Sequence, residues 1–400
     1  MSEEQVVQLP TARPAGCPFD PPEELARLRT ERPLAPMAYP DGHVGWLATS
    51  YALNREILAD LRFSSRQELL HSPMPGAGAL AGLLPPAPPG MFIGVDPPEH
   101  TRYRRLLTGK FTVRRMRLLT ERIERLAAAH LDAMAEHGPT VDLVAAYAQP
   151  IPAQLICELL GVPYEDREHF QQHAMTMNQR DTEPRDQYEA MTAIQGYLHE
   201  LVVAKRKQPT DDLLSDLATG DLTEEELTNI GTLLLAAGLD TTANMIALGM
   251  YALFRNPDQL AALRTDPTIA EGAVEELLRY LSIAHTNVRT ALVDVDMAGR
   301  LVRKGDSVTL SIQAANRDPD RFPNPDVLDL KRHAIGQLTL GHGVHQCLGQ
   351  QLARVQLRVA IPAVLGRFPT LALAIPAANV PLRTDYDIYG VHTLPVTWQI

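Results

Sequence analysis

One cysteine lies in a stretch whose residue types could bind a metal ion or a flat cofactor. Cys347 occurs in LGHGVHQCLGQQLAR, residues 340–354, among three glycines and two histidines. Gly341, Gly343 and Gly349 allow positive φ angles and a close approach of the backbone to a flat object. The apolar residues that follow have the spacing of a helix, and a helix N-terminus stabilises a thiolate.

Several roles for the Cys347 sulfur are compatible with these residues. It could bind zinc, act as a catalytic nucleophile, bind a haem iron or be a buried structural thiol. A zinc shell would need His333, His342 and His345, because no second cysteine lies nearby. A packed loop at the start of a helix is a poor cage for such a site, but the loop alone does not separate zinc from haem.

A second pattern places an acid beside a hydroxyl inside an apolar helix. The segment AAGLDTT, residues 236–242, contains Asp240 next to Thr241. A threonine hydroxyl that donates to the carbonyl four residues earlier bends a helix. A buried ionisable group is costly without a purpose. The pair is therefore either a proton-handling site or a kinked core helix with a satisfied aspartate.

Two further pairs have the spacing of one helical face. Glu276 and Arg279 in EELLRY are three residues apart, which alone indicates an ordinary ion pair. His100 and Arg104 in PPEHTRYRR are four apart and suit a carboxylate. Each pair alone could equally be a solvated group.

The pattern G-H-G-x-H-x-C-L-G resembles the haem-binding loop of bacterial cytochrome P-450 monooxygenases, in which the cysteine thiolate is the fifth ligand of the iron. The resemblance runs from about Cys17 to the C-terminus and is greatest to the soluble actinobacterial branch. It implies a mainly α fold with a minor β part, a triangular prism with a long central helix over the haem and small β-sheets. Leu340 and Leu328 depart from it, since the family usually has phenylalanine there, and the lost ring at Leu340 predicts a modest change in redox potential.

By this resemblance the chain is a haem-thiolate monooxygenase that inserts one oxygen atom from O2 into a C–H bond. Cys347 would bind the iron of haem b, Asp240 would relay protons, and Thr241 would hold the water that protonates bound dioxygen. A peroxide-driven peroxygenase and a non-catalytic haem gas-binding protein are the alternatives. The acid–alcohol pair argues against both, because family peroxygenases typically lack it and a carrier has no use for it.

The resemblance also assigns residues that hold the haem and its loop. Glu276 and Arg279 would join the later Arg332 in a buried triad that supports the cysteine loop. The other expected haem contacts are His100, Arg104, Arg289 and His345 at the propionates, together with Ala237 and Gly349.

The elements that must position these residues are mostly helical. Apolar periodicity predicts helices over 21–31 and 113–138, and a longer helix over 222–257 that is apolar on every side and therefore central. Asp41-Gly42 indicates a hairpin turn. We expect one domain over 1–400, with β-rich parts at about 35–50, 285–312 and 380–400.

Composition restricts partners and location. A formal net charge of −11 argues against nucleic acid or anionic lipid as a partner. We expect no apolar run of membrane-spanning length, and MSEEQVVQLP is not a signal peptide. Three separated cysteines indicate a reducing compartment rather than a disulfide framework. The expectation is a cytoplasmic monomer.

The electrons must come from another chain, because the sequence has no flavin or nicotinamide fingerprint. The family takes them from a ferredoxin that an NAD(P)H ferredoxin reductase reduces. Residues 102–117 contain seven Lys or Arg and no Asp or Glu, which suits an acidic donor unless they form only a solvated face.

The expected substrate is a bulky, mostly apolar small molecule, such as a macrolide, polyketide or terpenoid-like secondary metabolite or a xenobiotic. The candidate pocket residues are mostly aliphatic and small, although each is also a plausible core residue. They are Leu80, Leu83, Met91, Phe92, Leu233, Leu234, Ala237, Ala243, Ile283, Val288 and Ile388.

Overall fold

The computed structural model describes residues 5–14, 16–74, 84–110, 113–163, 166, 172–173, 176, 183–384 and 388–399. The chain divides into two compact units, each assembled from segments distant in sequence. The first comprises Met1–Ala87, Phe92–Arg104 and Glu275–Leu348, and the second comprises Pro88–Met91, Arg105–Val274 and Gly349–Ile400. The single domain expected over 1–400 stays a prediction.

The first unit is built on a five-stranded sheet of order β1-β2-β8-β5-β3, in which only β2 and β8 pair in parallel. Strands β6 and β7 form a separate two-stranded ribbon. The strands are β1 (Leu34–Ala38), β2 (Val44–Ala48), β3 (Phe63–Ser64), β5 (Thr286–Ala291), β6 (Val295–Met297), β7 (Arg300–Val302) and β8 (Ser307–Ser311). The helices wholly inside this unit are α1 (Glu23–Glu31), α2 (Tyr51–Ala59) and α12 (Ile312–Ala315).

The hairpin predicted at Asp41-Gly42 is confirmed. Strands β1 and β2 pair antiparallel with Ala38 opposite Val44, and Gly42 has a φ of +90° in the turn. A left-handed residue is needed there, and glycine adopts that conformation without the steric cost of a side chain.

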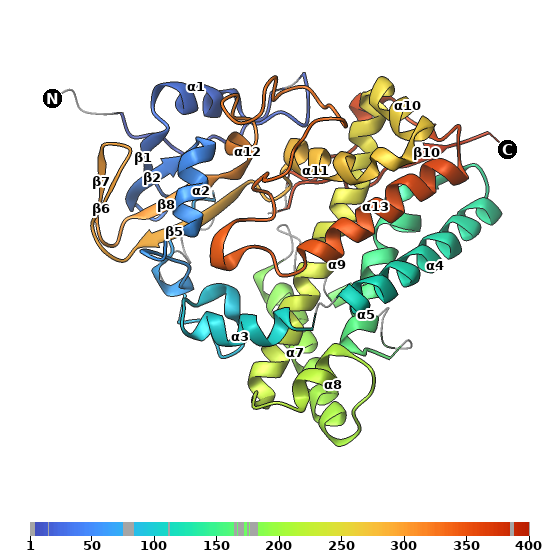
Figure 1. Cartoon of the computed structure of the whole chain (residues 1–400), viewed down its shortest axis with the longest axis horizontal. Coiled ribbons are helices and arrows are strands. Elements are labelled where there is room, and N and C mark those ends of the chain that lie inside the picture. Colours follow the sequence, from blue (N-terminus) through green and yellow to red (C-terminus); the bar gives the residue numbers. More distant parts are fainter. Residues whose placement is uncertain are drawn as a thin grey trace. The chain divides into compact units, whose positions relative to one another are not determined.

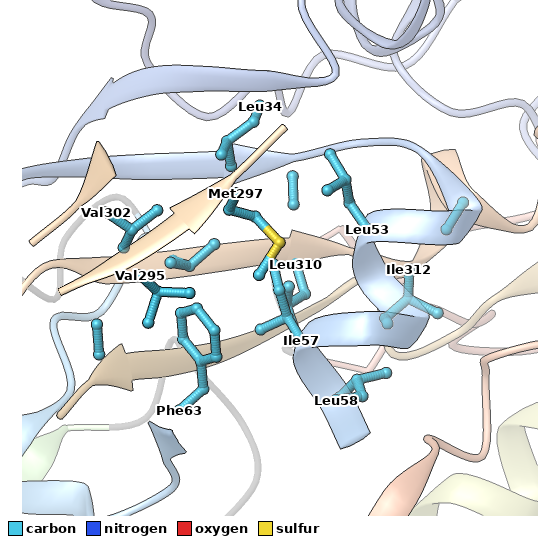
Figure 2. Packing of buried hydrophobic residues seen from close by; sticks show 14 of the residues in the cluster. Leu34, Leu53, Ile57, Leu58, Phe63, Val295, Met297, Val302, Leu310 and Ile312 are labelled. Atoms are coloured by element: carbon cyan, nitrogen blue, oxygen red, sulfur yellow. The ribbon is translucent and has the colours of Figure 1, made fainter. Parts of the chain in front are cut away.

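One face of this sheet is covered by α2 through a buried apolar cluster. Ile57 of the helix lies beside Leu310 of β8 and Met297 of the ribbon (Figure 2), and Leu58 and Phe63 belong to the same cluster. Such burial contributes about 1.5–3 kcal/mol for each large aliphatic side chain. The end of α2 is thereby fixed, and the cysteine loop rests against it.

The second unit is mainly helical (Figure 1). Its small sheet has the order β4-β10-β9. Its elements are α4 (Val113–His137), β4 (Thr140–Asp142), α5 (Pro150–Leu160), α7 (Pro184–Lys207), α8 (Leu213–Ala218), α9 (Glu224–Arg255), α10 (Pro257–Thr265), α13 (Gln350–Arg367), β9 (Ala372–Leu373) and β10 (Pro395–Thr397). Helices α3 (Glu99–Thr108) and α11 (Ala270–Leu281) contain residues of both units.

The long helix α9 is the centre of the second unit. It starts with a capping box, in which the Thr223 hydroxyl accepts from the Glu226 amide and the Glu226 carboxylate accepts from the Thr223 amide. Helices α5, α7 and α13 pack along it (Figure 1). This packing explains why the helix is apolar on every side.

Two expectations need correction. An apolar run of spanning length does exist, because α9 is long and apolar enough to cross a membrane, with a mean hydropathy of 1.4 over 18 residues. More than half of that window is buried inside the protein, as in a core helix. The β-rich part expected at 380–400 is reduced to β10 and a bridge between Leu382 and Val391 within the described residues.

Candidate active site

The cysteine loop is a tight turn that precedes α13. A single 3-10 turn, Gly343–His345, leads into it, and the Cys347 amide donates to the Leu340 carbonyl at 2.8 Å. Gly341 and Gly343 have φ angles of +73° and +74°. A Cβ on Gly343 would lie 2.3 Å from the Leu58 carbonyl oxygen, so the loop can approach α2 only with glycine there.

The expectation of positive φ fails for Gly349. This residue is the N-cap of α13, with a φ of −81°, and nothing lies within 4 Å of a Cβ built on it. Cys347 therefore stands two residues before the cap of a helix, where the exposed N–H groups favour a negative charge.

The three residues expected to support the loop meet in the first unit. Glu276 and Arg279 are fully buried and form a two-pronged pair, with Nε–Oε2 and Nη2–Oε1 distances of 2.7 and 2.8 Å. Arg332 Nε donates to Glu276 Oε1 at 3.1 Å. The Asp329 amide donates to the same oxygen at 3.0 Å. One buried carboxylate thus ties α11 to the irregular segment that precedes the loop.

Asn316 extends this network to the cysteine loop, and sequence reasoning did not find it. Its carbonyl accepts from Arg279 at 2.8 Å, and its side chain accepts from the Leu338 amide and donates to the Thr339 hydroxyl. Thr339 directly precedes Leu340, whose carbonyl accepts from Cys347. Its only sequence signal was a polar residue in a Pro/Asp/Asn-rich segment, where asparagine is common.

The residues expected at the propionates form a cationic cluster in the same unit as Cys347. The rings of His100, on α3, and His345 lie 4.1 Å apart between centroids. His100 is 2% exposed, and neither of its ring nitrogens has a hydrogen-bond partner among the described residues. Arg289, on β5, is buried beside them. Buried polar atoms without partners are rare in native proteins and here call for an added acceptor.

The pKa shifts in this cluster also indicate an excess of buried positive charge. Burial, then the positive neighbours His100, Arg289 and Arg104, lower the pKa of His345 to about 3. Burial lowers the pKa of Arg289 to about 10, opposed by Asp96. Burial also lowers the pKa of Arg104, and Cys347 opposes that shift. Burial outweighs the attraction of Asp96 at Arg289, so the cluster keeps an excess of positive charge and an added anion would be favoured.

Asp96 is the counter-charge that sequence reasoning missed. Its carboxylate accepts from the Ser64 hydroxyl at 2.6 Å and from the Ser65 amide at 2.9 Å, so it is anchored on β3 and the residue after it. Its only sequence signal was its position just before the Pro-Pro that precedes α3.

One line of residues along α9 is accessible to solvent, although most of the helix is buried; we call this line the stripe. Leu233, Leu234, Asp240 and Thr241 are partly exposed and Ala237 is exposed, whereas residues 242–253 are buried. The Thr241 hydroxyl donates to the Ala237 carbonyl at 2.8 Å, the bond expected from the sequence. The stripe has helical spacing, so it is one accessible line along the helix.

Asp240 has a partner that the sequence did not reveal. Arg383 donates from Nη1 to Oδ1 at 2.7 Å and from Nη2 to Oδ2 at 3.2 Å. No helical or strand spacing connects positions this far apart in the chain. The acid is therefore an ion-paired carboxylate in the second unit.

The candidate substrate residues have mixed environments. Leu80 and Leu83 lie outside the described residues. Met91, Val288 and Ile388 are partly exposed. Phe92, Ala243 and Ile283 are buried as core residues of their own units. Their place in a substrate pocket stays a prediction.

A cavity of about 490 Å³ lies in the first unit. Pro14, Cys17, Arg29, Ala314 and Arg317 are among those that line it. None of the predicted haem or substrate contacts is part of this wall, so it is not the predicted substrate pocket.

Part of the basic segment 102–117 has a structural role. Arg115 pairs with Asp216 at 2.7 Å, and Lys110 donates to the Asp216 carbonyl. Arg117 is exposed. Only some of these cations are therefore available to an acidic partner.

Comparisons with known proteins find similar sequences and structures over nearly the whole chain. The family model described as Cytochrome P450 matches residues 165–373. "Cytochrome P450 105C1" of a Streptomyces species is 48% identical over 383 residues, covering 95% of this chain and 96% of the relative. "Pentalenic acid synthase" of Streptomyces avermitilis is 40% identical, covering 98% of each. The crystal structure of CYP105P1 in complex with filipin I superposes with a TM-score of 0.92 at 39% identity, covering 99% of both chains.

Proposed function

This chain belongs to the cytochrome P450 family and is a haem b monooxygenase, and from that premise we propose that Cys347 is the thiolate ligand and that the substrate is a bulky, mostly apolar small molecule. The assignment of Cys347 as the ligand is supported by a buried cluster of polar side chains in the same unit. Both ring nitrogens of His100 are buried without partners, beside His345 and Arg289. A group with carboxylates, such as the haem propionates, fits this donor set.

The residues that would hold haem b follow from this fit. His100, Arg104, Arg289 and His345 would bind the propionates, and Cys347 would bind the iron. Ala237 has only a methyl group and Gly349 has no side chain, so neither would obstruct a flat ring. Glu276, Arg279 and Arg332 do not touch the cofactor but keep the loop of Cys347 in place through Asn316.

Bound haem supplies the activation of O2 at an iron made electron-rich by its thiolate ligand. The residues of this chain handle the protons. Because the Thr241 hydroxyl gives its hydrogen to Ala237, its oxygen is left as an acceptor for water. The Asp240 carboxylate is a second acceptor on the next residue. A water that donates one hydrogen to the Thr241 oxygen is oriented and keeps its second hydrogen for oxygen, and Asp240 can relay a replacement proton from a second water.

The substrate class is supported by the apolar stripe of α9. Leu233, Leu234 and Ala237 offer aliphatic surface next to Asp240 and Thr241. A relative at 40% identity is named for pentalenic acid, and a similar structure holds filipin I. We therefore place the substrate among bulky polyketide or terpenoid-like molecules, with oxygen inserted at a C–H bond.

The electron donor in this proposal is a ferredoxin with its NAD(P)H-dependent reductase, acting on a cytoplasmic monomer. Arg117 is exposed, whereas Arg115 is held by Asp216. Arg117→Glu should therefore raise the concentration of ferredoxin needed for half-maximal NADPH oxidation several-fold, and less so at high salt. An unchanged requirement would remove this residue from the docking surface.

The test of the function is a binding and turnover screen. Purified protein would be titrated with a panel of macrolides, polyketides and terpenoids, and the high-spin shift of the haem spectrum recorded. Hits would be incubated with ferredoxin, reductase, NADPH and ¹⁸O2, and one ¹⁸O atom is expected in the product. Cys347→Ser should lose the thiolate-type spectrum of the reduced carbon monoxide adduct. Product formed by hydrogen peroxide, but not by the ferredoxin system, would favour the peroxygenase.

A further inference from the structure

We propose that Arg383, in the C-terminal part of the second unit, is a positioning residue for proton delivery and fixes the direction of the Asp240 carboxylate. This inference rests on the proposed role of Asp240. It adds a residue that lies far from the α9 motif in sequence.

The contact between the two side chains is geometrically specific. The two terminal nitrogens of Arg383 each bond a different oxygen of Asp240, at 2.7 and 3.2 Å. The Arg383 side chain is 9% exposed and that of Asp240 is 19% exposed. A two-pronged pair of this kind fixes the plane of the carboxylate, whereas one bond leaves it free to rotate.

The backbone that is hydrogen-bonded to Arg383 also contacts α9, on the helical face that carries Asp240. The Arg383 amide donates to the Gly390 carbonyl at 2.9 Å. A Cβ on Gly390 would lie 1.9 Å from Asn244 Oδ1, so the turn reaches the helix only because glycine stands there. Asn244 in turn donates to the Asp240 carbonyl at 2.9 Å. Asp240 and Asn244 are four residues apart, so the turn touches one helical face at two successive points.

This arrangement decides what the acid can do. Each carboxylate oxygen has about two acceptor positions, and Arg383 uses one on each. The remaining positions point in directions set by the guanidinium plane. Water can therefore bind Asp240 from a fixed direction, beside the water that donates to the Thr241 oxygen.

Oxygen reduction without added substrate gives a direct measurement. Reduction of O2 to peroxide takes two electrons and two protons, and reduction to two waters takes four of each. Slow proton delivery therefore raises the fraction released as peroxide. The holoenzyme would be supplied with spinach ferredoxin, its reductase and NADPH, and peroxide released per NADPH would be measured in H2O and D2O.

The variants are Arg383→Lys, Arg383→Met, Asp240→Asn and the double variant Asp240→Asn/Arg383→Met. Arg383→Met should slow the proton-dependent step about tenfold or more, with a higher peroxide yield and a larger solvent isotope effect. Arg383→Lys keeps the charge without the two-pronged geometry and should lie between it and the parent enzyme. In the Asp240→Asn background, loss of Arg383 should add nothing.

Two controls separate positioning from stability. Arg122→Met removes another two-pronged pair of the second unit, Arg122 with Glu158, and should lower the melting temperature without changing the peroxide yield. Amide hydrogen exchange of the holoenzyme provides a readout independent of turnover. Arg383→Met should accelerate exchange of the amides at positions 383 and 392, which donate to the Gly390 and Pro381 carbonyls, and Arg122→Met should not.

The outcomes are distinguishable. The positioning role is wrong, and the proposed function stands, in either of two cases. Either Arg383→Met changes the peroxide yield no more than Arg122→Met does, or it changes the yield of the Asp240→Asn variant as much as that of the parent enzyme. If Asp240→Asn itself changes neither yield nor isotope effect, the proton role of Asp240 and this inference fail together. Should Arg383→Met not fold, Arg383→Lys decides by the same criteria.

Discussion

His100 and His345, from segments far apart in the chain, lie ring against ring with centroids 4.1 Å apart and planes inclined by 43°. Burial lowers the pKa of both histidines, that of His345 to about 3, so both rings are neutral at pH 7. Each neutral ring has one N–H to donate. The positive charge of the cluster therefore belongs to Arg104 and Arg289, and the histidines add hydrogen bonds.

The first prediction concerns haem retention. His100→Phe keeps an aromatic ring against His345 but removes both ring nitrogens. A hydrogen bond to a charged group contributes about 1.5–3 kcal/mol, so haem should transfer to excess apomyoglobin about tenfold faster or more. His137→Phe, at the exposed end of α4, is the matched control and should transfer haem at the parent rate. Equal rates for the two variants would contradict a propionate contact at His100.

The second prediction concerns the buried carboxylate. Glu276→Gln leaves the fully buried Arg279 without a counter-charge. Breaking such a pair on one side typically costs about 3–5 kcal/mol of unfolding free energy. Glu271→Gln on the same helix removes an exposed partner of Arg358, at 3.7 Å, and should change stability by less than about 1 kcal/mol. Denaturant unfolding of both variants measures the difference, and similar costs would show that the triad is not needed for stability.

The third prediction concerns the approach of the loop to α2. Gly343→Ala needs a left-handed φ and places its Cβ against the Leu58 carbonyl. The backbone strain alone costs about 1–3 kcal/mol, and the contact adds to it. Gly366→Ala in α13 meets nothing within 4 Å and should be neutral or stabilise by up to about 1 kcal/mol. If Gly343→Ala and Gly366→Ala changed the melting temperature equally, the close approach of Gly343 to Leu58 would be contradicted.

The fourth prediction concerns acid stability. His43 stacks on His71 at 3.8 Å, and its Nε2 accepts from the Ser307 amide at 3.2 Å. Burial, then His71, lower the pKa of His43, whereas Asp41 and Asp306 oppose the shift. The unfolded chain therefore takes up this proton first as the pH falls. The stabilisation is complete above about pH 6.5, the ordinary pKa of histidine, and decreases below it.

His43→Gln tests this sign. Glutamine keeps an acceptor for the Ser307 amide but does not titrate. Unfolding free energies between pH 8 and pH 5 should fall less steeply for the variant than for the parent protein. Parallel curves would mean that His43 does not contribute to the acid sensitivity. His71 and Tyr39, which face the same ring, are unchanged in both proteins.

Much of the fold could be predicted because its signals are local. The central helix was expected over 222–257 and lies at Glu224–Arg255, since its capping residues and apolar length are consecutive in sequence. The hairpin at Gly42 follows from one dipeptide. The short strands β4 and β9 were not predicted, because two or three residues carry no period, and pairing with β10 alone makes them strands.

The sequence by itself determined which chemistry this chain contains: a cysteine in a glycine-rich turn before a helix, an acid–alcohol pair, and cations at helical spacing. These are patterns of neighbours, and covalent connection fixes their order. Only the tertiary structure decided the partners across the chain, such as Arg383 on Asp240, Asn316 on Arg279, and Leu58 against Gly343. Such contacts depend on where packing brings distant segments, and no local spacing encodes them.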